Sequence, residues 1–133
     1  MKLTTKSEYS LLALIYIARH QDEGFVKIED ICSKYNIAKK YLEQLLLILR
    51  QNRLIKSKRG PRGGYCLARP AKQISVAEII RIMDGALAPT ESVSKYFFAN
   101  TPISHEKGLV KVFREIRNYI SKTLEELTLS QLI

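Results

Sequence analysis

Residues 38–65 read AKKYLEQLLLILRQNRLIKSKRGPRGGY, and this segment says more about the fold than any other part of the chain. Leucine and isoleucine recur every three or four residues as far as Leu49, which predicts an amphipathic helix that begins near Ala38. Two short strands are predicted over residues 54–58 and 65–68, because the glycines between them permit the positive φ angles of a tight turn. The central expectation is therefore a helix followed at once by a β-hairpin.

Two further helices are predicted upstream of this stretch. A threonine at position 4 or 5 can cap a first helix that runs to about His20, and its apolar positions fall at helical spacing on Tyr9, Leu12, Ile15 and Tyr16. Residues 28–35 predict a second helix, and Asn36 with Ile37 predicts a turn. Three helices followed by a hairpin is the order of a winged helix-turn-helix. The predicted fold class is mainly α, with a two-stranded wing.

The rest of the chain predicts two more helices separated by a long loop. Ser75 and Glu78 have the spacing of a capping box, which opens a fourth helix that ends near Asp84. A regular apolar period returns over residues 105–126. We therefore expect a winged helix-turn-helix domain over 1–84, a connecting or sensor loop over 85–104, and a long dimerisation helix with a C-terminal turn over 105–133.

The excess positive charge is confined to the first part of the chain. The formal net charge is +9, from 22 Lys and Arg against 13 Asp and Glu. Residues 1–75 hold 15 of the basic and 6 of the acidic residues, whereas residues 76–133 hold 7 of each. A basic first part suits contact with a polyanion. The alternatives are a basic surface kept for solubility and an anionic membrane surface, but no long basic amphipathic helix supports the latter.

Candidate DNA contacts gather in the helix 38–51 and in the hairpin. Glutamine can pair with adenine and glutamate with the cytosine amino group, while tyrosine and lysine suit phosphates. The hairpin crowds four positive side chains around a Gly-Pro turn, and Arg59 is our choice for insertion into the minor groove. The alternative is an ordinary amphipathic surface helix. The DNA-binding residues predicted on this basis are Lys39, Lys40, Tyr41, Glu43, Gln44, Arg50, Lys58, Arg59 and Arg62.

An apolar stripe in the last long helix predicts self-association. The stripe could pack on the fourth helix, but a small domain joined by a long loop offers little core to cover it. We therefore expect a two-fold homodimer that presents two recognition helices to a palindromic operator in double-stranded DNA. The predicted dimerisation residues are Leu109, Val112, Phe113, Ile116, Tyr119 and Ile120.

Catalytic and metal chemistry are not indicated. Cys32 and Cys66 suit packing positions and form no metal-ligand spacing with His20 or His105. The sequence contains no nucleophile-elbow, Walker or zinc-hydrolase pattern, so we predict no catalytic residue, no metal ligand and no enzyme. The apolar run 11–18 is too short to cross a bilayer, and without an export signal the expected location is the cytoplasm.

Four motifs, in this order along the chain, resemble the Rrf-two family of bacterial winged-helix transcription regulators. They are Leu3-Thr4-Thr5-Lys6 with Tyr9, Tyr41-Leu42-Glu43-Gln44-Leu45, Arg59-Gly60-Pro61-Arg62-Gly63-Gly64-Tyr65, and Ile74-Ser75-Val76-Ala77-Glu78-Ile79-Ile80 with Asp84-Gly85. The resemblance covers most of the chain and implies a homodimeric regulator, usually a repressor, whose long penultimate helix pairs the subunits. It also implies DNA contacts by Tyr41, Glu43, Gln44 and Arg59, and a wing shaped by Pro61 and Gly63.

Two features depart from that family pattern. Many relatives hold an iron–sulfur cluster with three cysteines in the loop before the dimer helix, whereas residues 85–108 contain none. The resemblance therefore implies the branch without a cluster, with no cofactor, whose signal can be a small molecule or a partner protein. Relatives also commonly follow the N-terminal lysine with glycine and a basic residue, whereas Ser7 and Glu8 stand here, which argues against a phosphate contact at that point.

A second function class stays open. The loop 86–104 carries Tyr96-Phe97-Phe98, which can line an effector or partner site, or pack back onto the dimer core. If the loop forms a partner site, the chain would be a protein-interaction module that recruits an enzyme through this loop, with DNA binding secondary. A stoichiometric partner held without DNA would favour this class.

Overall fold

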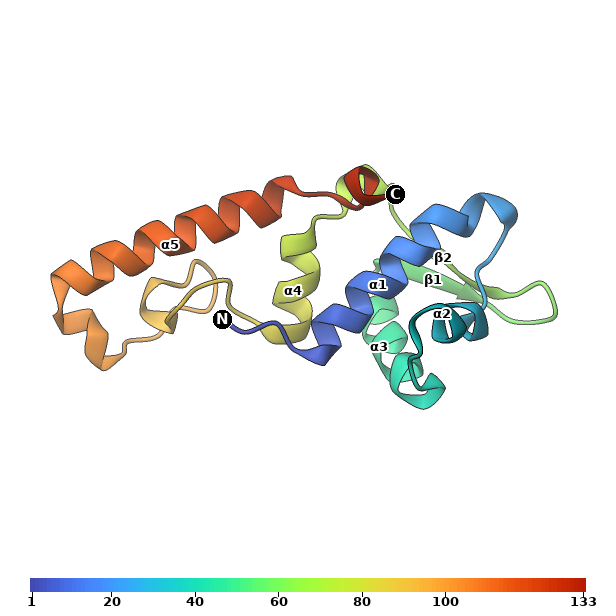
Figure 1. Cartoon of the computed structure of the whole chain (residues 1–133), viewed down its shortest axis with the longest axis horizontal. Helices are drawn as coiled ribbons and strands as arrows, with labels where there is room; N and C mark the ends of the chain where they lie inside the picture. Colours follow the sequence, from blue (N-terminus) through green and yellow to red (C-terminus); the bar gives the residue numbers. More distant parts are fainter.

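The computed structural model describes all 133 residues and confirms a mainly helical winged helix-turn-helix (Figure 1). The wing hairpin lies at one end of the molecule and the start of the last helix at the other (Figure 1). The fourth helix lies between the winged unit and the part formed by the long loop and the last helix. The helices are α1 (Thr5–His20), α2 (Ile28–Tyr35), α3 (Lys39–Gln51), α4 (Val76–Asp84) and α5 (Lys107–Glu126), and the strands are β1 (Ile55–Lys58) and β2 (Gly64–Leu67).

The two wing strands form an antiparallel hairpin with a third segment beside it. Ile55 faces Leu67 and Lys58 faces Gly64 across the pair. Val26 bridges to Tyr65 on the outer edge of β2, and each backbone N–H donates to the other residue's carbonyl oxygen at 2.8 Å. The extended segment between α1 and α2 therefore anchors the wing to the helices.

Gly64 makes this close approach possible. Its φ is +144°, and a Cβ at this position would overlap the Val26 carbonyl oxygen. We predict that Gly64→Ala lowers the free energy of unfolding by about 3 kcal/mol, because it combines a strained φ with a backbone clash.

Gly24→Ala is the matched control for this variant, measured by urea unfolding at equal protein concentration. Gly24 also has a positive φ, +111°, but no atom lies within 4 Å of the position of its Cβ. This variant should lose only about 1–2 kcal/mol, the cost of the φ strain alone. Equal losses in the two variants would contradict the role given to the Val26 contact.

The buried face of α1 differs from the prediction. Tyr9, Leu12, Ile15 and Tyr16 are only partly buried, and the fully buried side is formed by Ser7, Ser10, Ala13, Leu14, Ile17 and Ala18. The run 11–18 is apolar on every side, so its period cannot select one face. The buried face is instead the one that carries the small side chains, because they let the surrounding elements approach α1 closely.

Asp84, the last residue of α4, caps the start of α1. Its carboxylate accepts hydrogen bonds from the Thr4 backbone N–H at 3.0 Å, from the Thr4 hydroxyl, and from the Ser7 hydroxyl at 2.7 Å. Thr4 occupies the predicted N-cap position, but its own side chain caps nothing. Ser75 does cap α4 by accepting from Glu78 N at 3.2 Å, whereas the Glu78 carboxylate pairs with Arg69 instead of completing the predicted capping box.

The Asp84 contacts predict a pH-dependent stability. Partial burial raises the pKa of Asp84, but the hydrogen bonds from Thr4 and Ser7 and the charge of Lys6 outweigh it, so the net pKa is lowered. A lowered folded-state pKa gives stability that is present above the ordinary aspartate pKa and lost as the pH falls through the folded value. Asp84→Asn should therefore cost about 1–2 kcal/mol of unfolding free energy at pH 7.

Urea unfolding at pH 7 and near pH 3 checks this prediction. The difference between the parent and Asp84→Asn should shrink at the lower pH, because the stability contributed by the ionised carboxylate is lost as the pH falls toward its lowered folded-state pKa. Glu8→Gln is a suitable control, since Glu8 is exposed in the first turn of α1 and makes no hydrogen bond or ion pair with its side chain. A loss that is the same at both pH values would contradict the ionic character of the cap.

The chain after α5 returns to the winged unit. Ser75 bridges to Thr128, and Leu129 is fully buried in the main core. The loop 85–104 is also packed, with a short 3-10 turn over Glu91–Val93 and buried side chains at Leu87, Ala88, Ser92, Val93 and Ser94. Helix α5 thus contacts the loop and α4 along one side only, and its C-terminal end is fixed to the core through the final turn.

Candidate nucleic-acid interface

Helix α3 presents its predicted base contacts on one exposed face. Lys40, Glu43 and Gln44 are exposed, and together with Leu47 they line a shallow hollow. The opposite face is buried in the core through Leu42, Leu45, Leu46 and Leu49. Leu47 is missing from the predicted contacts, although it is 44% exposed. An apolar side chain at this place suits contact with a thymine methyl group.

Lys39, at the start of α3, is already paired with Glu29 of α2. Its Nζ lies 3.0 Å from Glu29 Oε1, and both side chains are exposed. The hydrogen bond raises the pKa of Lys39, while a backbone hydrogen bond and Lys39 lower the pKa of Glu29. The pair partly offsets the charge of Lys39. Lys40, which forms no ion pair, is therefore the better placed of the two for a phosphate.

Backbone contacts hold the wing tip in shape. Gly63 N donates to Gly60 O at 2.9 Å, and a Cβ on Gly63 would overlap the Lys58 carbonyl oxygen. Lys27 Nζ donates to Pro61 O at 2.9 Å and so ties the tip to the segment between α1 and α2. Pro61 and Gly63 thus occupy positions that determine the path of the tip. Lys27 is missing from the predicted residues because nothing in its local sequence points to a contact 34 positions away.

The positive side chains of the wing have no acidic partners. Lys56, Lys58, Arg59 and Arg62 are all exposed, and none forms an ion pair. Lys58 Nζ lies over the Phe25 ring, 5.7 Å from its centre, in a cation–π contact. Arg50 Nη1 donates to Ser57 Oγ at 3.1 Å and links the end of α3 to β1. The structure therefore leaves an uncompensated cationic wing beside α3.

A hollow at the start of α1 joins the recognition helix to the N-terminal motif. Thr5, Lys6 and Tyr41 line it together with Thr4, Met83 and Asp84. The Tyr41 ring packs edge-on against Tyr9 with centres 5.8 Å apart. Ser7 is one of the two residues that depart from the family pattern after Lys6. Its side chain is buried and donates a hydrogen bond to Asp84, so it is not free to contact a phosphate. Lys6 is exposed at the rim of this hollow. It is absent from the predicted DNA-binding residues, although the motif Leu3-Thr4-Thr5-Lys6 could have identified it as a candidate contact.

Four of the six predicted dimerisation residues lie on a side of α5 that this chain does not cover. Leu109, Val112, Ile116 and Tyr119, hereafter the apolar stripe, are between 41% and 74% exposed. At about 3.6 residues per turn they share one side of the helix. Phe113 is half-buried, and Ile120 packs against the small core cluster of Val76, Ala77, Ile80 and Leu87, so this part of the predicted stripe is covered within the chain. Large apolar side chains exposed in a continuous row are typical of an interaction surface.

The residues present do not fit an iron–sulfur cluster. Such clusters need cysteine thiolates gathered around the metal. Cys32 lies in α2 and Cys66 in β2, both as free thiols, and burial raises the pKa of Cys32. No three His, Cys, Asp or Glu side chains lie close enough together to hold a metal ion.

Comparison with known proteins assigns the family. A family model described as "Rrf2: Iron-dependent Transcriptional regulator" matches residues 3–133. The chain belongs to the Rrf2 family. This confirms the resemblance carried by the four sequence motifs, and it identifies the protein as a DNA-binding transcription regulator and not an enzyme.

Individual relatives are similar to this protein over nearly the whole chain. The transcriptional regulator IscR of Yersinia pestis is 34% identical over 135 residues, which covers 100% of this chain and 79% of that protein. Among solved structures, CymR, the global cysteine regulator of B. subtilis, has a TM-score of 0.80 at 31% identity and covers 99% of this chain and 95% of its own. IscR of T. potens has a TM-score of 0.76 at 30% identity, covering 99% and 85%. None of the helices has the length and apolar character of a membrane span.

Proposed function

We propose that this Rrf2 protein is a homodimeric, sequence-specific repressor that works without a metal centre in the cytoplasm. The observation that carries the proposal is the cationic wing beside α3, whose positive side chains have no acidic partners. Exposed charges at this density repel one another and are stabilised by the phosphates of DNA.

The two parts of the interface have different roles in this proposal. Glu43 and Gln44 read base edges in the major groove, and Lys40 and Tyr41 hold phosphates. Lys39, Arg50, Lys58 and Arg62 add to the positive field. Arg59, at the wing tip, enters the minor groove, where a narrow groove attracts arginine. Pro61 and Gly63 contribute through the shape of the tip.

Dimerisation is assigned to the region 105–133, joined to the winged domain 1–84 by the loop 85–104. Pairing of two apolar stripes would cover side chains that water now surrounds. A two-fold pair presents two copies of α3 to a palindromic operator.

Selection of bound duplexes from a random library, followed by gel-shift titration, tests the proposal. We expect palindromic sites, two chains per duplex, and an affinity that falls steeply with salt as counterions are released. Repression is tested separately with a reporter behind the selected site. A protein that stays monomeric and ignores DNA at low ionic strength would refute the assignment. An absorption spectrum of protein purified without air tests the missing cluster independently.

A second candidate function rests on the aromatic loop. Tyr96, Phe97 and Phe98 are 64%, 45% and 63% exposed, which suits recruitment of a partner enzyme. Pull-down with the parent and with a variant carrying alanine at all three positions tests it. A stoichiometric partner that the parent retains without DNA and the variant loses would favour an interaction module.

A further inference from the structure

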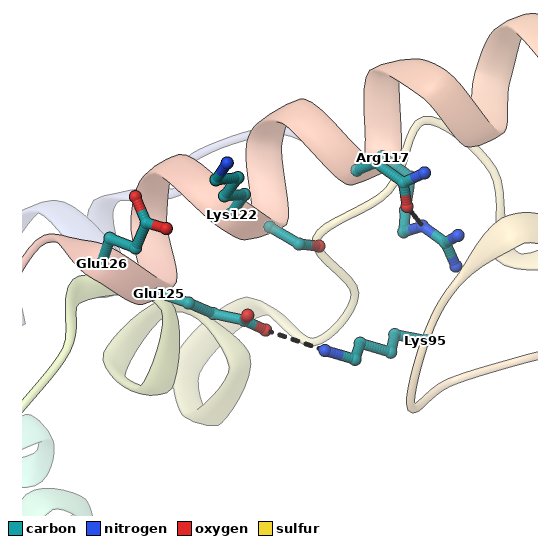
Figure 2. A pocket seen from close by; sticks show the side chains of 7 residues that line it. Lys95, Arg117, Lys122, Glu125 and Glu126 are labelled. Carbon is teal, nitrogen blue, oxygen red and sulfur yellow. Dashed lines mark hydrogen bonds and ion pairs between the residues drawn. The ribbon is translucent and has the colours of Figure 1, made fainter.

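A polar pocket of about 510 Å³ lies between the loop and the C-terminal half of α5 (Figure 2). Lys95 comes from the loop, and the other lining residues come from α5; none of them is hydrophobic. The charged and hydroxyl-bearing residues of the lining are Lys95, Arg117, Ser121, Lys122, Glu125 and Glu126. A volume of this size accommodates a small metabolite.

Two carboxylates line the pocket; the protein itself neutralises Glu125, whereas Glu126 is exposed and forms no ion pair. Glu125 Oε1 lies 2.8 Å from Arg81 of α4 and 3.5 Å from Lys95, and Figure 2 shows Lys95 reaching across from the loop. The hydrogen bond from Arg81 lowers the pKa of Glu125, so its carboxylate is ionised and shared between two cations. Glu125 therefore offers little free negative charge to a ligand.

The cationic side is not neutralised. Arg117 donates from Nη1 to Val93 O and from Nε to Asn118 Oδ1, each at 2.8 Å, so both of its hydrogen bonds go to neutral oxygens. Neither Arg117 nor Lys122 forms an ion pair. Two positive charges in a recess without carboxylate partners favour an anionic group.

Ser121 adds an independent observation. The residue is 5% exposed, it lines the pocket, and its Oγ has no hydrogen-bond partner. A buried hydroxyl without a partner is costly and rare in folded proteins. Ser121 lies one helical turn after Arg117, so both side chains can donate hydrogen bonds to the same bound carboxylate or phosphate group.

The pocket does not overlap the apolar stripe. Arg117, Ser121 and Glu125 follow one another at intervals of four along one side of α5, whereas Ile116 and Tyr119 project from another side. A dimer paired through the apolar stripe thus leaves these pocket residues on a different side of the helix.

From these contacts we infer that the pocket is a binding site for a small metabolite that carries a carboxylate or phosphate group. The oxyanion accepts hydrogen bonds from Ser121 Oγ and from the free Nη2 of Arg117, while Lys122 contributes charge from the rim. The site lies apart from the cationic wing, so it stands or falls independently of the proposed DNA contacts.

Calorimetric titration of the full-length protein tests the site, with succinate and inorganic phosphate as separate probes at constant ionic strength. We expect saturable binding of about one equivalent per chain for at least one probe, and the probe that binds distinguishes a carboxylate from a phosphate ligand. Ser121→Ala and Lys122→Gln should each weaken this binding about tenfold, the loss expected for one charge-assisted contact.

Two controls separate this pocket from general attraction to a basic protein. Lys111→Gln removes an exposed lysine from the same helix outside the pocket, and Arg59→Ala removes an arginine from the wing. Both should bind the probes as the parent does. Ser121→Ala should also keep or raise the unliganded melting temperature, because it deletes an unpartnered hydroxyl. No saturable binding by either probe, or equal weakening by the two controls, would overturn the inference.

Discussion

Ile116→Glu is expected to leave the protein monomeric and to weaken binding to a two-half-site operator by about 100-fold or more. Ile116 is 41% exposed in the single chain and lies in the middle of the apolar stripe. In the proposed dimer a carboxylate at this position would be buried without a partner, which costs more than the interface can supply. Each monomer would then hold only one half-site, without the gain from a linked second contact.

Sedimentation of the protein alone, followed by gel-shift titration, measures both effects. Lys111→Glu is the matched control, because it introduces the same side chain on an exposed position of α5 outside the apolar stripe. That variant should remain a dimer. If Ile116→Glu sediments as a dimer and binds like the parent, the apolar stripe is not the dimer interface.

Arg59→Ala is expected to weaken operator binding by about 10- to 100-fold, which corresponds to roughly 1–3 kcal/mol. Arg59 is exposed at the wing tip with no acidic partner, so its removal leaves the protein fold unchanged while it removes a cation from the DNA. The plot of log affinity against log salt should also become less steep by roughly 1, because fewer counterions are released.

Lys72→Ala is the control for net charge. Lys72 is exposed in the short turn Ala71–Gln73, which follows β2 at the end of the hairpin away from the tip. Its removal should change neither the affinity nor the salt dependence appreciably. An Arg59→Ala protein that binds as tightly as the parent would show that the wing tip does not touch DNA.

The predictions from sequence succeeded where local chemistry determines the structure. The glycines at 60, 63 and 64 predicted the hairpin, and β1 and β2 differ from the predicted strands by one residue at their ends. Asn36 has a φ of +54°, as its role in the turn before α3 requires. Long-range contacts were not predictable in this way. The cap on α1 comes from Asp84, 80 positions away, and Leu129 enters the core from the far end of the chain.

The candidate site shows the same division. Exposure of Lys40, Gln44 and Arg59 could be predicted because polar residues on an amphipathic helix and on a hairpin tip face the solvent. The pairing of Lys39 with Glu29 depends on how α2 packs against α3, and no pattern within one helix reports it. The pocket with Ser121 depends on the path of the loop 85–104, which has no period to interpret. Those features required the tertiary structure.

The buried final turn also limits the geometry of any complex. Leu129 N donates to Ile74 O at 3.0 Å and Val76 N donates to Leu127 O at 2.9 Å, so the end of α5 cannot pivot freely relative to the winged unit. In a paired molecule, the crossing angle of the two α5 helices would then set the distance between the two copies of α3. The C-terminal residues would therefore determine the number of base pairs between the operator half-sites, although they do not themselves contact the DNA.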